Sequence, residues 1–184
     1  MNDNGHTTDL LQKAWMFAAQ RHQGQTYPAT ELPYLVHLGS VLLELGPALA
    51  VQPQLDSGLA LCCAILHDTI EDTGTTRDEV ERMFGQQVAE GVMALSKNPE
   101  IADKRAAMTD SLRRIRQCPK EVWLVKLSDR TANLGTPPVH WNAAKRRAYA
   151  EEGDLILSEL GEASPLLAAR LGERIAAWKA HEGV

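Results

Sequence analysis

The feature that most constrains this chain is an apolar segment, residues 59–66, that ends in four titratable side chains. The segment reads LALCCAIL, and His67, Asp68, Glu71 and Asp72 follow it directly. A helix that is apolar on every side is normally buried in the core of a fold. Charged groups at its end are costly there unless a counter-charge balances them. A divalent cation would balance them, so the segment indicates both a buried helix and a candidate metal site.

Apolar residues recur with helical spacing through nearly the whole chain, and no pair of alternating segments predicts a sheet. Gly85 and Pro119 supply stop signals, and Thr76 with Glu79 forms a capping-box pattern at a helix start. We therefore expect a single all-α domain with irregular helix packing rather than a simple four-helix bundle. The predicted helices cover approximately residues 10–22, 34–46, 57–67, 77–84, 88–95, 108–118, 120–134, 141–160 and 165–181.

Length and composition narrow the class of protein. The chain has 184 residues, of which 44% are hydrophobic, enough for one globular domain with a core. The net charge is -5 and no basic run occurs, which argues against a nucleic-acid backbone as the main partner. No apolar run approaches the ~20 residues of a membrane span, and the N-terminus lacks a signal-peptide pattern. We expect a cytoplasmic protein, and the sequence leaves its oligomeric state open.

Two further helices each place a candidate ligand on an inward face. His37 lies on the apolar stripe of the second predicted helix. Asp129 follows Val125 by four residues and Val122 by seven, so it shares their buried face. Asn133 lies one helical turn beyond Asp129 on the same face. The predicted inward groups therefore come from three separate helices.

Together with His67 and Asp68, these helices offer two imidazoles and two carboxylates to one site. A mixed nitrogen and oxygen set without a thiolate suits a first-row divalent ion such as Mn²⁺, Fe²⁺ or Zn²⁺. Such an ion acidifies water and neutralises charge on a phosphoryl group. Glu71 and Asp72 lie just beyond the ligand pair, and they are the candidate acid and base that would orient or deprotonate a water molecule.

Each of these residues has a structural alternative. A single inward histidine is more often a hydrogen-bonded core residue than a ligand, and a single inward aspartate is often a cap or an ion-pair partner. Glu71 and Asp72 have the alternative role of capping the helix that follows. The joint pattern favours the metal site, because four unrelated structural roles would otherwise have to coincide on three helices.

Four segments of the chain resemble the HD-domain hydrolases. They are residues 21–25 (RHQGQ), 33–37 (PYLVH), 64–73 (AILHDTIEDT) and 125–134 (VKLSDRTANL). The resemblance runs in order over about residues 14–149. It is strongest to the alarmone hydrolase branch, which comprises the hydrolase half of bifunctional (p)ppGpp synthetase/hydrolases and the stand-alone small alarmone hydrolases. On this resemblance, residues 1–184 form a single HD hydrolase domain with C-terminal helices at 141–181.

The resemblance implies the HD-domain helical fold and a hydrolase that needs a divalent metal, Mn²⁺ in these relatives, with one ion per chain. The implied reaction removes the 3′-pyrophosphate from (p)ppGpp and leaves GDP or GTP. The metal ligands that it implies are His37, His67, Asp68 and Asp129. The residues that it implies for activating the water are Glu71 and Asp72.

The same resemblance suggests substrate contacts. Asn133 would lie beside substrate or metal, and Lys97 falls where relatives carry a basic residue that contacts phosphate. Lys145 lies within a Trp, basic residue and Tyr spacing on a late helix, so it could also meet a phosphate. The alternative for both lysines is a solvated surface position. Lys126 and Arg130 could likewise reach the pocket or form pairs on a helix surface.

The resemblance has one departure, at Tyr27 and Pro28. Relatives that act on (p)ppGpp usually carry a basic pair there. Tyr27 could instead stack on the base of the substrate, or the loop could be structural. Adenine alarmones, (p)ppApp, another nucleotide and NADPH therefore stay open as substrates. A metal-free helical regulatory module descended from the enzyme is the hypothesis from a different class.

Overall fold

The computed structural model describes residues 3–28, 30–135, 137–138 and 140–180, and within these ranges no strand forms. Thr26 and Pro33 make an isolated antiparallel bridge. The all-α prediction is therefore confirmed. The helices are α1 (Asp3–Arg21), α2 (Leu35–Ala50), α3 (Ser57–Leu66), α4 (Thr69–Thr73), α5 (Arg77–Phe84), α6 (Gln86–Leu95), α7 (Lys104–Ile115), α8 (Lys120–Asn133), α9 (Ala143–Leu160) and α10 (Pro165–Ala180), with a 3-10 turn η1 at Gly161–Ala163.

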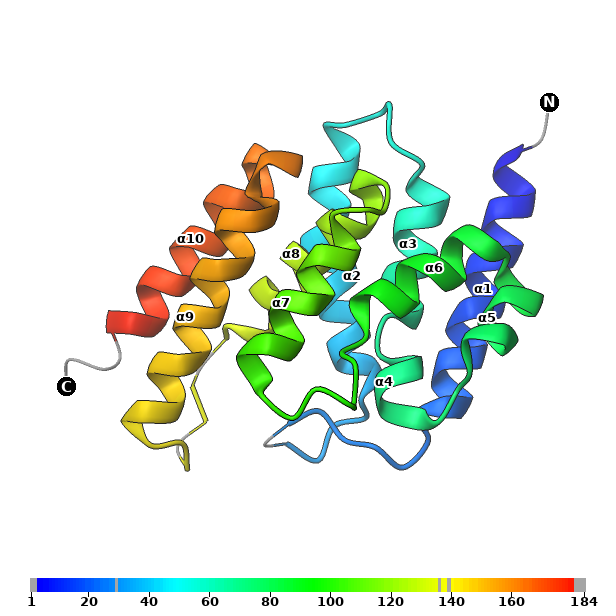
Figure 1. The fold of residues 1–184 in the computed structure, drawn as a ribbon. Helices are drawn as coiled ribbons and strands as arrows, with labels where there is room; N and C mark the ends of the chain where they lie inside the picture. The colour runs from blue at the N-terminus through cyan, green and yellow to red at the C-terminus, as the bar shows by residue number, and fades with distance from the viewer. Residues whose placement is uncertain (1–2, 29, 136, 139, 181–184) are drawn as a thin grey trace.

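α8 is the central helix of the fold (Figure 1). Every residue from Glu121 to Thr131 is buried, and the helix packs against α2, α3, α9 and α10. α3 also packs against α1 and α6, so residues 62–66 of the apolar segment lie inside the core, as predicted. α9 and α10 pair at one end of the molecule, and α1 and α5 lie at the other.

Local side-chain chemistry explains where several helices begin. Four helices start after a side chain that accepts a hydrogen bond from the backbone N–H three residues later, at 2.7–3.2 Å: Asp56, Thr76, Asp103 and Asn142. Such caps satisfy one of the N–H groups that a helix start leaves without a partner. The predicted capping box at Thr76 is half present, because the Glu79 carboxylate pairs with Arg21.

The second helix extends beyond its predicted end. The prediction placed the end near residues 46–47, whereas α2 continues through Pro47 to Ala50. Proline lacks the N–H that would bond the carbonyl of Leu43 one turn earlier. Pro47 is exposed and Leu43 is 79% exposed, so water can reach that carbonyl. Leu45 is fully buried and holds the same helix against the core.

The short helix α4 was not predicted. α3 ends at Leu66, a turn at His67 and Asp68 interrupts the helix, and α4 then runs over Thr69–Thr73. Gly74 ends it with a φ of 70°, a left-handed conformation that favours glycine. The break separates two pairs of candidate site residues that would otherwise lie on one continuous helix.

Smaller differences concern the last predicted helices. The helix predicted from residue 141 begins at Ala143, because Asn142 acts as its cap. α10 is described to Ala180, and the last residue of that prediction, His181, lies outside the described residues.

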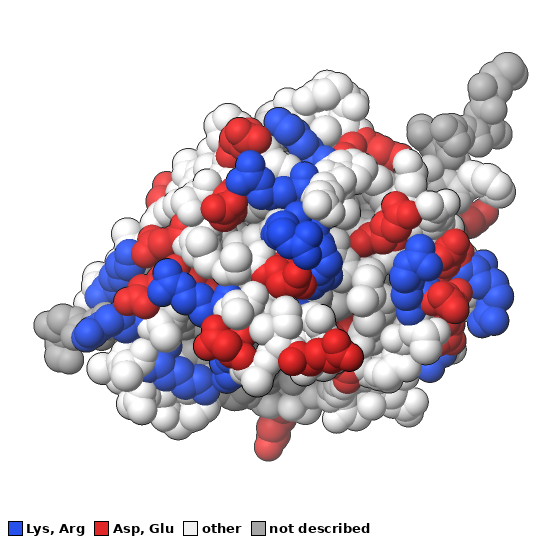
Figure 2. Space-filling view, viewed as in Figure 1, with Lys and Arg blue, Asp and Glu red and all other residues white. Residues whose placement is uncertain are grey.

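The surface of the protein carries both signs of charge. Figure 2 shows acidic and basic side chains interspersed over the visible face. Among the helices of the described residues, none is both long enough and apolar enough to cross a membrane.

We expect the substitution Gly91→Ala to destabilise the fold by about 1–3 kcal/mol, the usual cost of overpacking a core. A Cβ atom at Gly91 in α6 would lie 2.8 Å from Cys63 Sγ and 3.0 Å from Val122 Cγ2. Both neighbours are buried in the core, so neither can move away without disturbing α3 or α8. Unfolding in urea measures the change.

Gly39→Ala in α2 is the matched control. Nothing lies within 4 Å of a Cβ atom there, so alanine should stabilise the helix by roughly 0.5–1 kcal/mol. An equal change in the free energy of unfolding in the two variants would contradict the close packing of α6 on α3 and α8.

Candidate metal centre and active site

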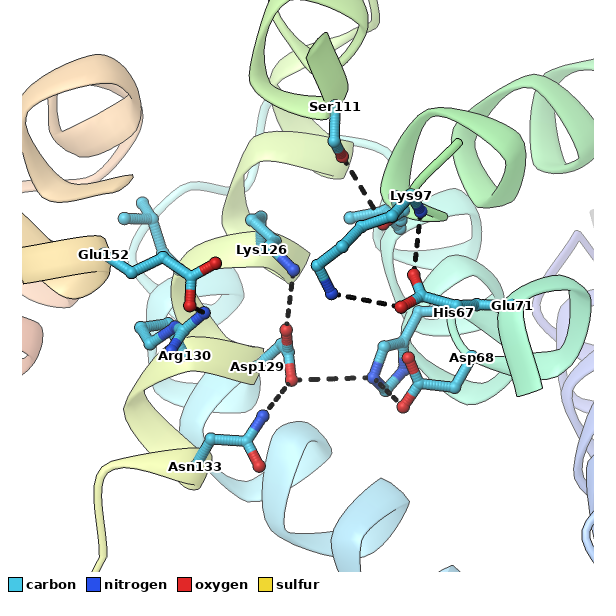
Figure 3. A network of polar contacts seen from close by, with 12 residues as sticks. His67, Asp68, Glu71, Lys97, Ser111, Lys126, Asp129, Arg130, Asn133 and Glu152 are labelled. Carbon is cyan, nitrogen blue, oxygen red and sulfur yellow. Dashed lines mark hydrogen bonds and ion pairs between the residues drawn. The ribbon is translucent and has the colours of Figure 1, made fainter. Parts of the chain in front are cut away.

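The end of α3 places His67 at the edge of the core. The side chain is 3% exposed, and its Nδ1–H donates to the carbonyl of Ala64 at 2.8 Å. In the neutral ring this leaves the lone pair on Nε2, which is the arrangement of many metal-binding histidines. The helix break places the Asp68 carboxylate next to the same imidazole (Figure 3).

Three parts of the fold bring the four predicted ligands together. The Nε2 atoms of His37, from α2, and His67 lie 3.2 Å apart. Asp68 Oδ2 lies 2.9 Å from the His67 nitrogen and 3.5 Å from the His37 nitrogen. Asp129 Oδ1, from α8, lies 3.5 Å from His37 Nε2 and 3.7 Å from His67 Nε2. The ligand atoms of His37, His67 and Asp129 all lie within 4.8 Å of one another, and these three residues are buried.

The donor set fits a divalent cation. Metal-to-ligand bonds of about 2.0–2.2 Å place neighbouring ligand atoms roughly 3 Å apart. The nitrogen and oxygen separations given above run from 2.9 to 3.7 Å. Two imidazole nitrogens that face each other also need a proton or a cation between them. Two imidazoles and two carboxylates without a thiolate match Mn²⁺, Fe²⁺ or Zn²⁺.

Lys126 and Asn133 fix the orientation of Asp129. Lys126 Nζ donates to Oδ2 at 3.0 Å, and Asn133 Nδ2 donates to Oδ1 at 2.6 Å (Figure 3). Burial alone would raise the pKa of Asp129, but the Lys126 ammonium and the two histidines hold this pKa well below its usual value. The carboxylate is therefore charged, with Oδ1 turned toward the imidazoles. Lys126 is 6% exposed, which rules out the alternative of a helix-surface pair for it.

The same two carboxylates raise the pKa values of both histidines. Burial alone would lower the pKa of His67, but the charge of Asp68 and the nearby Asp129 carboxylate raise this pKa well above its usual value. The pKa of His37 is also raised, because the neighbouring carboxylates of Asp129 and Asp68 outweigh its burial. Protons therefore occupy this site in the metal-free protein at neutral pH.

Tyr34 is a site residue to which the sequence analysis gave no role of its own, beyond its place in the 33–37 segment of the resemblance. Its hydroxyl donates to Asp68 Oδ2 at 2.5 Å. Burial and the Asp68 charge raise the pKa of the phenol, so the hydroxyl keeps its proton and donates. The sequence feature that could have identified Tyr34 is its position three residues before His37, because that spacing brings two side chains together on a helix.

Glu71 lies beside Lys97 at the opening of the site. Lys97 binds both oxygens of this carboxylate: its backbone N–H donates to Oε2 at 2.8 Å and its Nζ to Oε1 at 3.0 Å (Figure 3). The Glu71 charge raises the pKa of Lys97 despite its burial. The structure thus brings Lys97 to the predicted acid–base pair, where it neutralises one of the two carboxylates.

Asp72 differs from Glu71 in having a free carboxylate. Within the described residues this carboxylate makes no hydrogen bond to the protein, whereas the Asp72 carbonyl accepts one from Gln25 at 2.9 Å. Partial burial and the charges of Asp68 and Glu71 raise the pKa of Asp72 to about 6. A carboxylate with a pKa near neutrality is suited to accept a proton from a water molecule.

Arg130 forms a second buried pair behind the ligands. It is 4% exposed, its Nη2 donates to Glu152 Oε2 at 2.7 Å, and its guanidinium lies 4.2 Å from the ring centroid of Tyr149. The alternative of a helix-surface pair is wrong for this residue too. The contact joins α8 to α9 next to Asp129 (Figure 3).

The remaining predicted substrate residues, Tyr27 and Lys145, differ in their surroundings. The Tyr27 ring is half-buried and stacks on His37, with centroids 6.0 Å apart and planes 12° apart. Lys145 is exposed, and its Nζ lies 4.1 Å from the ring centroid of Trp141. The structure therefore brings Tyr27 to the predicted metal ligand His37, and it places Lys145 against an aromatic side chain of the C-terminal part.

The chain matches the family model of the HD domain over residues 14–172. It is 36% identical over 148 residues to a GTP pyrophosphokinase rsh of Brucella melitensis, covering 78% of this chain and 19% of that protein. It is also 36% identical over 155 residues to the bifunctional (p)ppGpp synthase/hydrolase SpoT of Escherichia coli K12, covering 82% of this chain and 21% of that protein. The chain thus spans about a fifth of the length of these relatives.

Solved structures show the same fold. A structure described as a metazoan ortholog of SpoT that hydrolyzes ppGpp superimposes with a TM-score of 0.76 at 22% identity, covering 91% of this chain and 94% of that one. A protein of Listeria monocytogenes EGD-e superimposes with a TM-score of 0.60 at 20% identity, covering 79% of this chain and 99% of that one. Both superpositions support one continuous helical fold.

We expect the affinity of the metal-free protein for Mn²⁺ to rise with pH. The carboxylates raise the pKa values of His37 and His67, so an ion must displace a proton held there. The affinity should rise by up to about tenfold per pH unit for each proton released, until the pH exceeds the raised pKa. Calorimetry in two buffers with different ionisation enthalpies counts the protons.

The control for this measurement is His140→Ala, at an exposed histidine, which should bind Mn²⁺ like the unmodified protein. His67→Ala should lose the binding. An affinity that does not change between about pH 6 and pH 8, without proton release, would contradict the assignment of the histidines as ligands.

Proposed function

The chain belongs to the HD domain family, and on this basis we propose that it is a metal-dependent nucleotide 3′-pyrophosphohydrolase. The proposed substrates are the alarmones (p)ppGpp, (p)ppApp or both. The products are pyrophosphate with GDP or GTP, or with ADP or ATP. One observation carries the proposal: the ligand atoms of His37, His67 and Asp129 meet at a buried site, with Asp68 Oδ2 beside both imidazoles and Asp72 one helical turn beyond Asp68.

The names of two relatives support the reaction class. One Escherichia coli relative is a bifunctional (p)ppGpp synthase/hydrolase, and another is a guanosine-3′,5′-bis(diphosphate) 3′-pyrophosphohydrolase. Each shares 36% identity with about four-fifths of this chain. Of the synthase and hydrolase activities in these names, we propose only the hydrolase reaction for this chain. That reaction needs the candidate metal ligands and carboxylates that the chain carries.

The ion that we propose for the site is one Mn²⁺ per chain. The chemistry that a divalent ion supplies there is acidification of water and neutralisation of phosphoryl charge. Tyr34, Lys126 and Asn133 orient the two aspartate ligands, each through a hydrogen bond to a carboxylate oxygen. Partners of this kind hold ligands in place and tune their basicity.

Asp72 is the proposed general base. It accepts a proton from the water, whose oxygen forms a bond to the phosphorus attached to the ribose 3′-oxygen. The bond between that phosphorus and the 3′-oxygen breaks, and a proton ends on the 3′-oxygen. Glu71, held by Lys97, is the second carboxylate that orients the water. The raised pKa of Asp72, about 6, suits transfer near neutral pH.

The proposed substrate contacts surround this centre. Lys97 Nζ would exchange Glu71 for a phosphate oxygen while the Lys97 backbone N–H keeps its bond to Glu71, and Asn133 would donate beside Asp129. Lys145 would meet a phosphate from the C-terminal side. Tyr27, stacked on His37, would place its ring against the nucleotide base. We further propose that the protein acts in the cytoplasm on this small-molecule nucleotide, without nucleic acid or membrane.

A substrate panel tests the function. We expect incubation with ppGpp, ppApp and NADPH in the presence of Mn²⁺ to release pyrophosphate from at least one alarmone. Ion chromatography separates pyrophosphate from orthophosphate. Orthophosphate from NADPH with both alarmones intact would overturn the proposed substrate, and protein that neither takes up Mn²⁺ nor turns over any nucleotide would favour the metal-free regulatory module.

Asp129→Asn is the matched control, because it keeps the shape of the side chain and can still accept from Lys126. We expect it to abolish turnover while the helical circular dichroism spectrum stays unchanged. Turnover at the unmodified rate in this variant would exclude the assigned site.

The role of Tyr27 has its own test. If the ring stacks on the base, Tyr27→Ala should raise KM by roughly 5- to 150-fold, which corresponds to the ~1–3 kcal/mol of one stacked base, and leave kcat nearly unchanged. Tyr27→Phe keeps the ring and should behave like the unmodified protein. Steady-state kinetics with the preferred alarmone measure both, and an unchanged KM in Tyr27→Ala would mean that the loop does not contact the base.

A further inference from the structure

α4 is held at both of its ends by the segment that follows α1, residues 22–34. At the start of α4 the Tyr34 hydroxyl donates to Asp68 Oδ2, and at its end Gln25 Nε2 donates to the backbone carbonyl of Asp72 at 2.9 Å. The Asp72 carbonyl lies in the last turn of a five-residue helix, where carbonyl groups have no partner within the helix. The two contacts therefore act on the two ends of the element that carries Asp68 and Asp72.

The orientation of the Gln25 amide follows from its partners. A backbone carbonyl only accepts, so the amide nitrogen must face Asp72, and Oε1 then faces His22 Nδ1 at 2.7 Å. Because Oε1 only accepts, His22 Nδ1 must carry the proton. Burial lowers the pKa of His22, so the ring is neutral with its single proton on Nδ1. The geometry thus defines one tautomer of His22.

His22 also supports Tyr34. It is 1% exposed, and its ring stacks on the Tyr34 ring with centroids 4.6 Å apart and planes 25° apart. The backbone joins the same residues: Gln25 N–H donates to the His22 carbonyl at 3.0 Å, and Tyr34 N–H donates to the Gln25 carbonyl at 3.1 Å. One buried imidazole therefore contacts both side chains that bind the two ends of α4.

We propose that His22, Gln25 and Tyr34 form a positioning clamp that sets the placement of the Asp72 carboxylate relative to the metal ligand Asp68. The inference rests on the proposed function, because it concerns the same site. A helix of one turn is unstable by itself, so its position depends on outside contacts. A displacement of about 1 Å at a reacting group costs on the order of 100-fold in rate. The contact of Gln25 with Asp72 therefore affects kcat, and the contact of Tyr34 with Asp68 affects metal affinity.

Gln25→Glu tests the contact to Asp72. The carboxylate keeps the size of the side chain and still accepts from His22 Nδ1–H, but it cannot donate to the Asp72 carbonyl. We expect kcat to fall roughly 10- to 100-fold, as for other residues that orient a site through a hydrogen bond, while KM and Mn²⁺ affinity stay unchanged. A merely structural role would not separate kcat from KM in this way.

Tyr34→Phe tests the contact to Asp68. Phenylalanine keeps the stacking on His22 and removes only the hydroxyl. We expect Mn²⁺ affinity, measured by calorimetry without substrate, to fall roughly 10- to 100-fold. Affinity equal to that of the unmodified protein would overturn this half of the proposal.

The His22 tautomer gives a readout that needs neither substrate nor metal. The nitrogen chemical shifts of the imidazole, measured by ¹⁵N NMR, should report a proton on Nδ1 in the unmodified protein and in Gln25→Glu. They should change in Gln25→Ala, which removes the acceptor. The control is Gln23→Ala, at an exposed glutamine of the same turn, with unchanged kinetics, affinity and spectrum. Thermal unfolding of every variant identifies any loss of fold.

The outcomes separate this proposal from the proposed function. A proton on His22 Nε2, or kcat in Gln25→Glu equal to that of the unmodified protein, overturns the clamp even if alarmones are hydrolysed. If the unmodified protein cleaves no nucleotide of the panel, the proposed reaction fails, while the Tyr34→Phe affinity and the His22 tautomer still decide whether the clamp exists.

Discussion

Two imidazoles and two carboxylates meet inside an apolar core, and the rest of the structure depends on how their charges are balanced. Any one of them alone would be costly to bury. Together they are tolerated, because the carboxylate oxygens face histidine nitrogens, Lys126 or the Tyr34 hydroxyl. This balance fixes the relative positions of α2, α3 and α8, since a slip of one helix by one turn would move its ligand by about 5.4 Å. The apolar face of α3 and the buried α8 supply the packing that prevents such a slip.

Two ion pairs around the candidate ligands each join two elements of the fold. Lys97 joins the end of α6 to Glu71 of α4, and Arg130 joins α8 to Glu152 of α9. The two ends of α4 are held by the segment after α1. The centre is therefore built where most of the helices converge, although its ligands come from three of them. A family whose chemistry depends on such convergence needs the whole helical fold to place a few side chains.

That the candidate ligands lie close together could be predicted from the sequence, because His37 and Asp129 lie on strongly periodic helical faces. His37 shares the stripe of α2, and Asp129 shares the face of Val122 and Val125, which is buried as expected. The contact of Gln25 with Asp72 and that of Arg130 with Glu152 could not be predicted in the same way. They join residues 47 and 22 positions apart, and periodicity describes only neighbours on one helix. The continuation of α2 through Pro47 was missed for a related reason, because whether a proline is tolerated depends on which side of the helix meets solvent.

Three cations around the centre already have acidic partners: Lys97 has Glu71, Lys126 has Asp129 and Arg130 has Glu152. Without its ion, the opening of the site therefore presents little uncompensated positive charge, and the whole chain carries a net charge of -5. A polyanionic ligand that approaches from a distance meets weak repulsion rather than attraction. Its association rate should then rise or stay constant as ionic strength increases, since salt screens that repulsion over roughly 10 Å. Under the proposed function, recognition would then be a short-range event in which Lys97 exchanges Glu71 for a phosphate oxygen after contact.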